Sequence, residues 1–183
     1  MKIILVRHGE SEGNVKHEIN DNPQRIVNLT ERGREQAEAA AERLCTMRFT
    51  HAYASQFPRA QQTAAILLHH HQLKLNIDAR LNERRSGMDG QHVDVFNDYV
   101  REDYLRIKPP RGESFLEQME RLRSFLDEAA MLHPDGIVLA VSHENPIVAV
   151  RALTVQDPEQ VMLSSLNNCE SIELVWPVVE GAF

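Results

Sequence analysis

The sequence predicts an α/β protein, a three-layer α/β/α sandwich with a mainly parallel central sheet. Short apolar runs rich in β-branched residues alternate along the chain with longer segments of strong helix formers. Strands that alternate with helices in this way usually build parallel sheets that are covered on both faces. Because the chain contains no internal repeat, low-complexity segment or linker, residues 1–183 are expected to form a single domain.

The first part of the chain reads as strand, helix, strand. Residues 2–6 form an apolar, β-branched run of the kind that is buried on both faces of a sheet. Thr30 has N-cap chemistry and precedes a run of strong helix formers, which predicts a helix from about residue 31 to residue 47. Residues 50–55 then predict the second strand.

The middle of the chain is less regular. Pro58 suits the first turn of a helix that continues through residues 59–71. Residues 73–78 alternate like a strand. The stretch 79–112 is polar, although residues 93–106 have helical spacing that ends before a proline pair.

The last part again alternates between helix and strand. Ser114 and Glu117 form a capping box, which predicts a helix over residues 114–132. The clearest strand of the chain follows at 136–142. A further helix is expected at 146–153 and a final strand at 171–176.

Composition and charge bound the class of protein. The chain has 183 residues, 42% hydrophobic and 26% charged, which is typical of a soluble globular domain with a full core. A net charge of -7 argues against nucleic acid and anionic membranes as partners, but a few converging arginines still allow an anionic substrate. Two cysteines, Cys45 and Cys169, are too few for a disulfide framework.

No apolar run is long enough for a bilayer span, and the run at residues 3–6 is too short for a signal-peptide core. We therefore expect a cytoplasmic protein. The oligomeric state is left open, with a homodimer among the alternatives.

Polar residues follow three of the predicted strands at the point where each strand ends: Arg7 and His8, Ser55 and Arg59, and Ser142, His143 and Asn145. The carboxyl ends of parallel strands meet at one edge of a sheet, where ligands bind. The planar fork of arginine suits phosphate oxygens, and a neutral imidazole is a capable nucleophile. The pattern predicts a site for a phosphoryl group that one histidine attacks.

The motifs "RHGESEGN", "LTERGREQA", "SQFPRAQQTA", "LNERRSGMDG", "GES" and "VSHEN" occur in that order. Together they resemble the histidine phosphatase superfamily, in its phosphoglycerate-mutase-like branch, from Lys2 to about Leu153. An RHG triplet alone is a weak signal, whereas RHGE after an N-terminal strand with RAxQTA and SH downstream is a specific one. The resemblance implies the phosphoglycerate-mutase-like fold, with a mostly helical insertion at about 84–112 over the active site.

The resemblance also implies roles for individual residues. His8 is the expected nucleophile, which forms a phosphohistidine intermediate, and Glu83 is the expected general acid for the leaving group. Arg7, Arg59 and His143 are expected to hold the phosphate oxygens, with Asn14 and Asn145 as further phosphate contacts. Fixed cations and a proton donor match the charge that develops in phosphoryl transfer. No metal or other cofactor is expected.

Water is the favoured acceptor, which makes the expected function hydrolysis of a small phosphorylated metabolite by a metal-independent phosphatase. Only 60 positions separate Glu83 from His143, where cofactor-dependent mutases carry a longer insertion. A phosphoglycerate mutase remains an alternative, because Arg84 matches an arginine of the mutase motif. A phosphohistidine protein phosphatase and a phosphate-binding protein without catalysis are further alternatives.

Some residues also have simpler interpretations. Arg7 could instead be a structural residue that forms an ion pair, and Asn145 could instead cap a helix. For Glu83 the alternative is a surface salt bridge with neighbouring arginines (Arg80, Arg84 and Arg85). The tract His69, His70 and His71 is interpreted as a solvated helix end, because consecutive helical residues point in different directions. An exposed acidic face is expected at Asp94, Asp98, Glu102 and Asp103.

Glu144 departs from the family pattern, since many relatives have glycine after the second catalytic histidine. It places a carboxylate near the expected phosphate pocket. Whether this side chain points away or recognises a cationic group on the substrate is left open by the sequence.

Overall fold

The structure is a computed structural model that describes residues 1–155, 157–162 and 165–176. Its centre is a five-stranded sheet in the order β3-β2-β4-β1-β5. The strands are β1 (Lys2–Arg7), β2 (His51–Ala54), β3 (Leu75–Ile77), β4 (Ile137–Ser142) and β5 (Ser171–Val175). The first four are parallel to one another, and β5 pairs antiparallel with β1 at the sheet edge. The predicted mainly parallel sheet is therefore confirmed.

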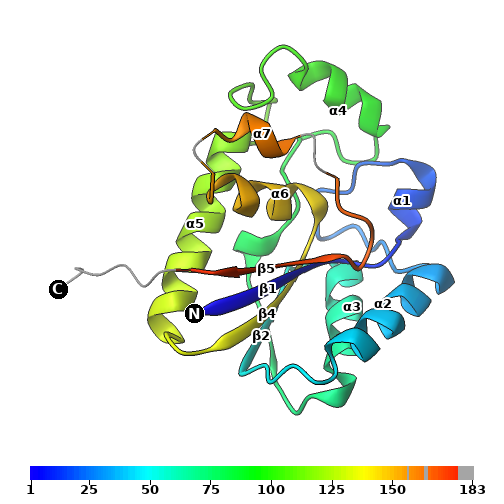
Figure 1. Cartoon of the computed structure of the whole chain (residues 1–183). Helices are drawn as coiled ribbons and strands as arrows, with labels where there is room; N and C mark the ends of the chain where they lie inside the picture. Colours follow the sequence, from blue (N-terminus) through cyan, green and yellow to red (C-terminus); the bar gives the residue numbers. More distant parts are fainter. Residues whose placement is uncertain (156, 163–164, 177–183) are drawn as a thin grey trace.

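Seven helices and two short 3₁₀ turns accompany the strands in the described part of the chain. The helices are α1 (Glu12–Lys16), α2 (Glu31–Leu44), α3 (Pro58–Leu67), α4 (Val93–Val100), α5 (Phe115–Leu132), α6 (Glu144–Ala152) and α7 (Glu159–Met162), and the 3₁₀ turns are η1 (Leu68–His70) and η2 (Ala79–Leu81). Figure 1 shows α5 and α6 on one face of the sheet and α2 and α3 on the other. This arrangement is the predicted α/β/α sandwich.

Two apolar clusters hold the three layers together, because alternate residues of a strand face opposite sides of the sheet. Ile3 and Leu5 of β1 pack into the cluster that contains the apolar side chains of α5 and α6. Ile4 and Val6 face the cluster built from the alanines of α2 and α3. Small alanine side chains on α2 and α3 let these helices approach the sheet closely.

Three helices end earlier than the sequence pattern indicates. The helix expected to continue through residue 71 ends at Leu67 and is followed by the 3₁₀ turn η1. The helix expected to reach residue 47 ends at Leu44, before Cys45 and Thr46, which are poor helix formers. The helical spacing at 93–106 yields a helix only to Val100. After it, the Asp103 carboxylate accepts a hydrogen bond from the amide of Arg106 (3.0 Å), which favours a turn over a continued helix.

Two short helices, α1 and α7, were not predicted. They have five and four residues, which is too short for a 3.6-residue period to be recognised. Helix α1 follows the carboxyl end of β1 and α4 lies above the same end of the sheet, so both border the site described next (Figure 1). Within the described residues, no helix is both long and apolar enough to cross a membrane.

Candidate active site

A cavity of about 510 Å³ opens at the carboxyl ends of β1 and β4. Its walls come from the β1–α1 segment, the loop after α1, the start of α3, the segment after η2, α4 and the start of α6. It is lined by Arg7, His8, Ser11, Gly13, Asn14, His17, Glu18, Ile19, Asn20, Arg59, Glu83, Arg84, Ser86, Val93, Phe96, Asn97, Glu144 and Asn145. Six of the seven sequence-predicted site residues are in this set, and the seventh, His143, lies directly behind it.

The contacts of His8 define which ring nitrogen carries the proton. Nδ1 lies 2.6 Å from the carbonyl oxygen of Gly9, which can only accept, so Nδ1 donates. Nε2 accepts a hydrogen bond from Nε of Arg59 (3.0 Å). Burial and the Arg59 charge hold the pKa of His8 well below its usual value. His8 is therefore a neutral imidazole protonated at Nδ1, and its Nε2 lone pair points at Arg59.

Arg59 sits at the centre of the site and is only 4% exposed. Besides His8, its guanidinium donates to both the side-chain and the main-chain oxygen of Asn20 and to Nδ1 of His143 (3.1 Å). Its Cζ lies 4.5 Å from the ring centroid of Phe57. Burial lowers the pKa of Arg59 to about 10, so its charge lacks full compensation in this state.

His143 occupies the N-cap position of α6 and is fully buried. Since an arginine only donates, Nδ1 of His143 accepts from Arg59, and Nε2 lies 2.8 Å from Oγ of Ser55. Burial and Arg59 lower the pKa of His143 well below its usual value. The structure thus places a neutral His143 against Arg59, with its ring centroid 5.0 Å from that of His8.

Two glycines let the His8 loop approach helix α2 closely. A Cβ on Gly9 would lie 2.3 Å from the carbonyl oxygen of Gly33, and a Cβ on Gly33 would lie 2.0 Å from that of Glu10. Neither backbone has room for a side chain at these contacts. The glycines in "RHGE" and "TERG" therefore fix the position of the His8 loop against α2.

Arg7 is held by a carboxylate of the same cavity. Its Nη1 lies 2.9 Å from Oε2 of Glu144 and also donates to the carbonyl oxygen of Leu166. The amide of Leu166 in turn donates weakly to Oε1 of Glu144 (3.4 Å). Glu144 therefore lies beside Arg7 in the wall of the cavity. Arg7 is at once a cavity residue and an ion-pair partner, so both interpretations describe it.

Glu83 follows η2 and is partly buried, with Oε1 accepting a hydrogen bond from the amide of Arg84 (2.8 Å). Burial raises the pKa of Glu83 above its usual value, opposed by that amide, the Arg59 charge and the Asn145 side chain. The neighbouring arginines have other partners: Arg80 pairs with Asp78 and Glu128, and Arg85 with Glu113. The surface salt-bridge interpretation of Glu83 is therefore wrong.

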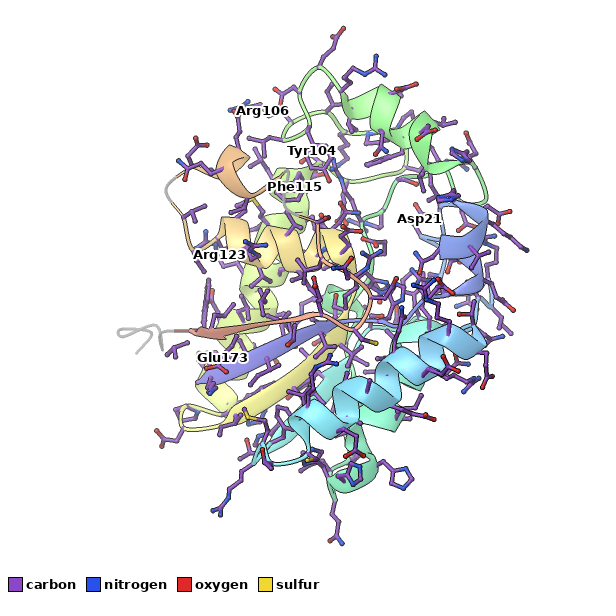
Figure 2. All side chains as sticks on the ribbon, turned by 45° about the vertical axis from the view of Figure 1, so that its right-hand side comes forward. Asp21, Tyr104, Arg106, Phe115, Arg123 and Glu173 are labelled. Carbon is purple, nitrogen blue, oxygen red and sulfur yellow. The ribbon has the colours of Figure 1, made fainter. Side chains whose placement is uncertain are left out.

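Arg84 is enclosed by aromatic rings. Its Cζ lies 4.6 Å from the ring centroid of Tyr104, 4.9 Å from that of Phe96 and 5.7 Å from that of Phe115. The rings of Tyr104 and Phe115, which are labelled in Figure 2, lie 5.2 Å apart. Arg84 is 2% exposed and donates long hydrogen bonds to main-chain carbonyls (3.4–3.5 Å). It fixes the segment after η2 against α4 and α5.

The two predicted asparagines hydrogen-bond to other residues, one near in the sequence and one distant. Oδ1 of Asn14 accepts from the amide of Ser11 (3.0 Å) and completes the cap of α1. Oδ1 of Asn145 accepts from the hydroxyl of Tyr104 (2.7 Å). Helix α6 is capped at His143, so the helix-cap interpretation of Asn145 is wrong.

Two carboxylates, of Asp21 and Asp89, join two segments at the rim of the cavity, because each accepts hydrogen bonds from main-chain amides of the other segment. Oδ2 of Asp21, labelled beside α1 in Figure 2, accepts from the amides of Ser86 (2.5 Å) and Gly87 (2.9 Å). Oδ1 of Asp89 accepts from the amide of Asp21 (3.0 Å) and from the side chain of Asn20 (3.3 Å). Asn20 thereby connects this rim to Arg59.

The sequence did not predict Asn20 or the apolar residues that line the cavity. Asn20 lies in an irregular segment with no period to mark it, and its contact with Arg59 spans 39 positions. The apolar wall residues Ile19, Val93 and Phe96 likewise come from segments far apart in the chain. Only the helical spacing of α4 gave a signal, because it placed Phe96 and Val100 on one buried face.

The remaining sequence interpretations are simple to report. His69 and His70 are exposed as expected, but His71 is partly buried, with its ring centroid 5.1 Å from that of Phe49. Asp94, Asp98 and Glu102 are exposed, while Asp103 is partly buried. Across residues 1–155, 157–162 and 165–176 there is no group of three or more histidine, cysteine, aspartate or glutamate side chains that could hold a metal ion.

Comparison with known proteins agrees with the motifs. A probable phosphoglycerate mutase GpmB from Enterobacter sp. is 34% identical over 155 residues, which cover 78% of this chain and 69% of that protein. A 2,3-bisphosphoglycerate-dependent phosphoglycerate mutase from Brucella anthropi is 33% identical over 181 residues, covering 90% and 87% of the two chains.

A similar solved structure is that of mycobacterial glucosyl-3-phosphoglycerate phosphatase in complex with VO3. It is 26% identical, has a TM-score of 0.83, and the likeness covers 95% of this chain and 90% of that one. The sequence model of the histidine phosphatase superfamily (branch 1) matches residues 3–178 of this chain. With this match and the site geometry together, the chain belongs to the histidine phosphatase superfamily.

Proposed function

We propose that this protein is a metal-independent phosphatase that hydrolyses a small phosphomonoester through a phosphohistidine on His8. The observation that carries the proposal is the state of His8, a neutral imidazole whose Nε2 faces Arg59 at the wall of the cavity. A neutral nitrogen lone pair is the nucleophile that phosphoryl transfer to histidine needs.

The first step moves the phosphoryl group to the enzyme. Nε2 of His8 attacks phosphorus, the bond to the leaving oxygen breaks, and Glu83 gives its proton to that oxygen. The raised pKa of Glu83 supports this role, because a carboxyl group must be protonated near neutral pH to act as an acid. Arg7 and Arg59 supply the positive charge opposite the equatorial phosphate oxygens.

The second step returns His8 to its starting state. The Glu83 carboxylate takes a proton from water, the resulting nucleophile attacks phosphorus, and the P–N bond breaks to release inorganic phosphate. When phosphate is bound, its charge compensates the buried Arg59, whose pKa is lowered by burial. We propose that His143, which contacts Arg59, is a further residue of the phosphate site. Asn14 and Asn145 are proposed as further phosphate contacts from the cavity wall.

A phosphoglycerate mutase is the second candidate, because the curated relatives described above carry that name. The two functions differ in the acceptor of the phosphoryl group. A mutase returns it to a phosphoglycerate and releases little free phosphate, whereas a phosphatase transfers it to water. A cavity of about 510 Å³ favours a small molecule over a phosphohistidine protein as substrate.

The test is to trap the intermediate and follow the product. The parent protein is mixed with p-nitrophenyl phosphate, and the reaction is quenched in alkali, where phosphohistidine is stable. The mass of the peptide that contains His8 is then measured by mass spectrometry. We expect an added phosphoryl group on His8, and release of free phosphate.

His8→Ala should lose both signals, while His69→Ala, at an exposed histidine, should keep them. Phosphate release by His8→Ala at the parent rate would end the nucleophile assignment. Interconversion of 2- and 3-phosphoglycerate with little phosphate release would favour the mutase.

A further inference from the structure

The cavity is larger than a phosphate group, and its outer part has apolar walls. Ile19, Val93 and Phe96 line it together with His17 and Asn97. A volume of about 510 Å³ lies within the roughly 300–1,000 Å³ that is typical of small-molecule sites. The leaving group of the substrate therefore has room for an organic body with an apolar face.

Two carboxylates, Glu144 and Glu18, also line the cavity. Glu144 forms an ion pair with Arg7 at 2.9 Å, and both side chains are partly shielded, with 33% and 15% of their surface exposed. Glu18 also lines the cavity, and its own partner, Arg25, is not a lining residue. Glu18 is thus compensated by Arg25, and Glu144 is the carboxylate that lies directly against Arg7 of the phosphate clamp, by which we mean Arg7 and Arg59.

The charges of the clamp leave no surplus for a second anion. Arg7 and Arg59 face the phosphate position, and Glu144 compensates one of them. A phosphomonoester near neutral pH carries up to two negative charges. Once it is bound, a further carboxylate or phosphate on the substrate would face Glu144 rather than an uncompensated cation.

Arg84, the remaining arginine of the cavity wall, does not supply that cation in this structure. Its guanidinium is enclosed by Phe96, Tyr104 and Phe115, and its Nη1 is buried without a hydrogen-bond partner among the described residues. An anion would reach Nη1 only after the ring cage opened. The experiment below distinguishes this outcome.

From this distribution of charge we infer that the substrate is a monophosphate of an uncharged, partly apolar alcohol or phenol, and that Glu144 excludes leaving groups that bear a second negative charge. The inference rests on the proposed phosphatase function and names its substrate class. It also assigns a role in substrate selection to the carboxylate of Glu144.

The experiment compares two substrates that differ by a carboxylate. Glycerol 3-phosphate and 3-phosphoglycerate have the same carbon skeleton, and phenyl phosphate serves as the standard for phosphatase activity. In the parent protein, kcat/KM for glycerol 3-phosphate should exceed that for 3-phosphoglycerate by about tenfold or more, because like charges in a partly shielded site repel.

Three variants test the role of Glu144. Glu144→Gln should reduce the discrimination several-fold or more by raising relative turnover of 3-phosphoglycerate. Glu144→Asp keeps the charge and should retain much of the discrimination, which separates charge from folding. Glu128→Gln is the matched control, since Glu128 pairs with Arg80 away from the cavity, and it should leave the ratio unchanged.

The outcomes separate the two proposals. No phosphate release from any of the three esters, phenyl phosphate included, would overturn the proposed function. Release from phenyl phosphate combined with a preference for 3-phosphoglycerate would leave the function standing and overturn the inference, with Arg84 as the cation reached. A folded Glu144→Gln variant with an unchanged ratio would also overturn it.

Discussion

Replacing Arg59 by lysine tests the geometry of the site while keeping its charge. The guanidinium donates four hydrogen bonds to protein atoms: to Nε2 of His8, to both oxygens of Asn20 and to Nδ1 of His143. It has five N–H groups in a fixed plane, whereas a lysine ammonium has three. Lysine therefore cannot make all four bonds, even before a phosphate oxygen enters.

The size of the effect follows from that count. An ammonium held by these protein contacts has fewer donors left for the phosphoryl group, so at least one charge-assisted hydrogen bond to a phosphate oxygen should be lost, and such a bond contributes about 1.5–3 kcal/mol. Because 1.4 kcal/mol corresponds to a factor of ten, kcat/KM should fall by roughly tenfold to a hundredfold. The loss should exceed this range if phosphate binding itself uses two donors of Arg59.

Steady-state kinetics with p-nitrophenyl phosphate measure the loss, and competition by vanadate reports on the phosphate clamp directly. Vanadate should bind Arg59→Lys more weakly than the parent. Thermal unfolding of both proteins checks the fold, and Arg101→Lys, at an exposed arginine, is the control that should retain parental kinetics. If the Arg59→Lys variant turns over substrate like the parent, or binds vanadate equally well, Arg59 does not hold the phosphoryl group.

Further expectations concern the acid, the histidine, the loop contact and metals. Glu83→Gln should slow alkyl phosphates more than p-nitrophenyl phosphate, whose leaving group needs little protonation, and equal losses would point to a structural role. Since the pKa of folded His8 is lowered, the unfolded chain binds more protons below about pH 6.5, and the free energy of unfolding should fall as pH drops from 7.5 to 5.5. Urea titrations should show a shallower fall in His8→Asn, by up to about 1.4 kcal/mol per pH unit, whereas parallel curves would contradict the pKa direction. Gly33→Ala should destabilise the fold by about 1–3 kcal/mol in the same assay, because its Cβ meets the carbonyl oxygen of Glu10, and an unchanged midpoint would refute the close contact. EDTA should leave turnover unchanged, and loss of activity that one divalent metal restores would overturn the metal-free mechanism.

Much of the fold was predictable because each layer has its own local signal. The apolar run of β1 and the capping box of α5 indicate a strand and a helix from a few residues each. Element ends were less predictable, since side chains such as Asp103 compete with the helix for backbone amides. The direction of β5 depends on its pairing with β1 and has no local signature.

The location of the site was predictable for a different reason. In a parallel sheet the carboxyl ends of strands converge, so Arg7, His8 and Arg59 meet whatever the loops do. What they contact depends on the loops, and the partnerships of Arg59 with Asn20 and of Arg7 with Glu144 connect residues far apart in the chain. No pattern along the sequence announces such contacts, because they arise only when the segments pack.

The hydrogen bonds that Asp21 and Asp89 accept across the rim have a consequence for the local opening of the structure. Each carboxylate holds main-chain amides of the other segment, so neither side of the rim can detach without releasing the partner's hydrogen bonds. The loop after α1 and the segment before α4 should therefore open as one cooperative unit, with similar amide hydrogen-exchange rates. Asn20 ties that unit to Arg59. An anion that immobilises the arginine should consequently slow exchange along both sides of the rim, including amides that it never touches.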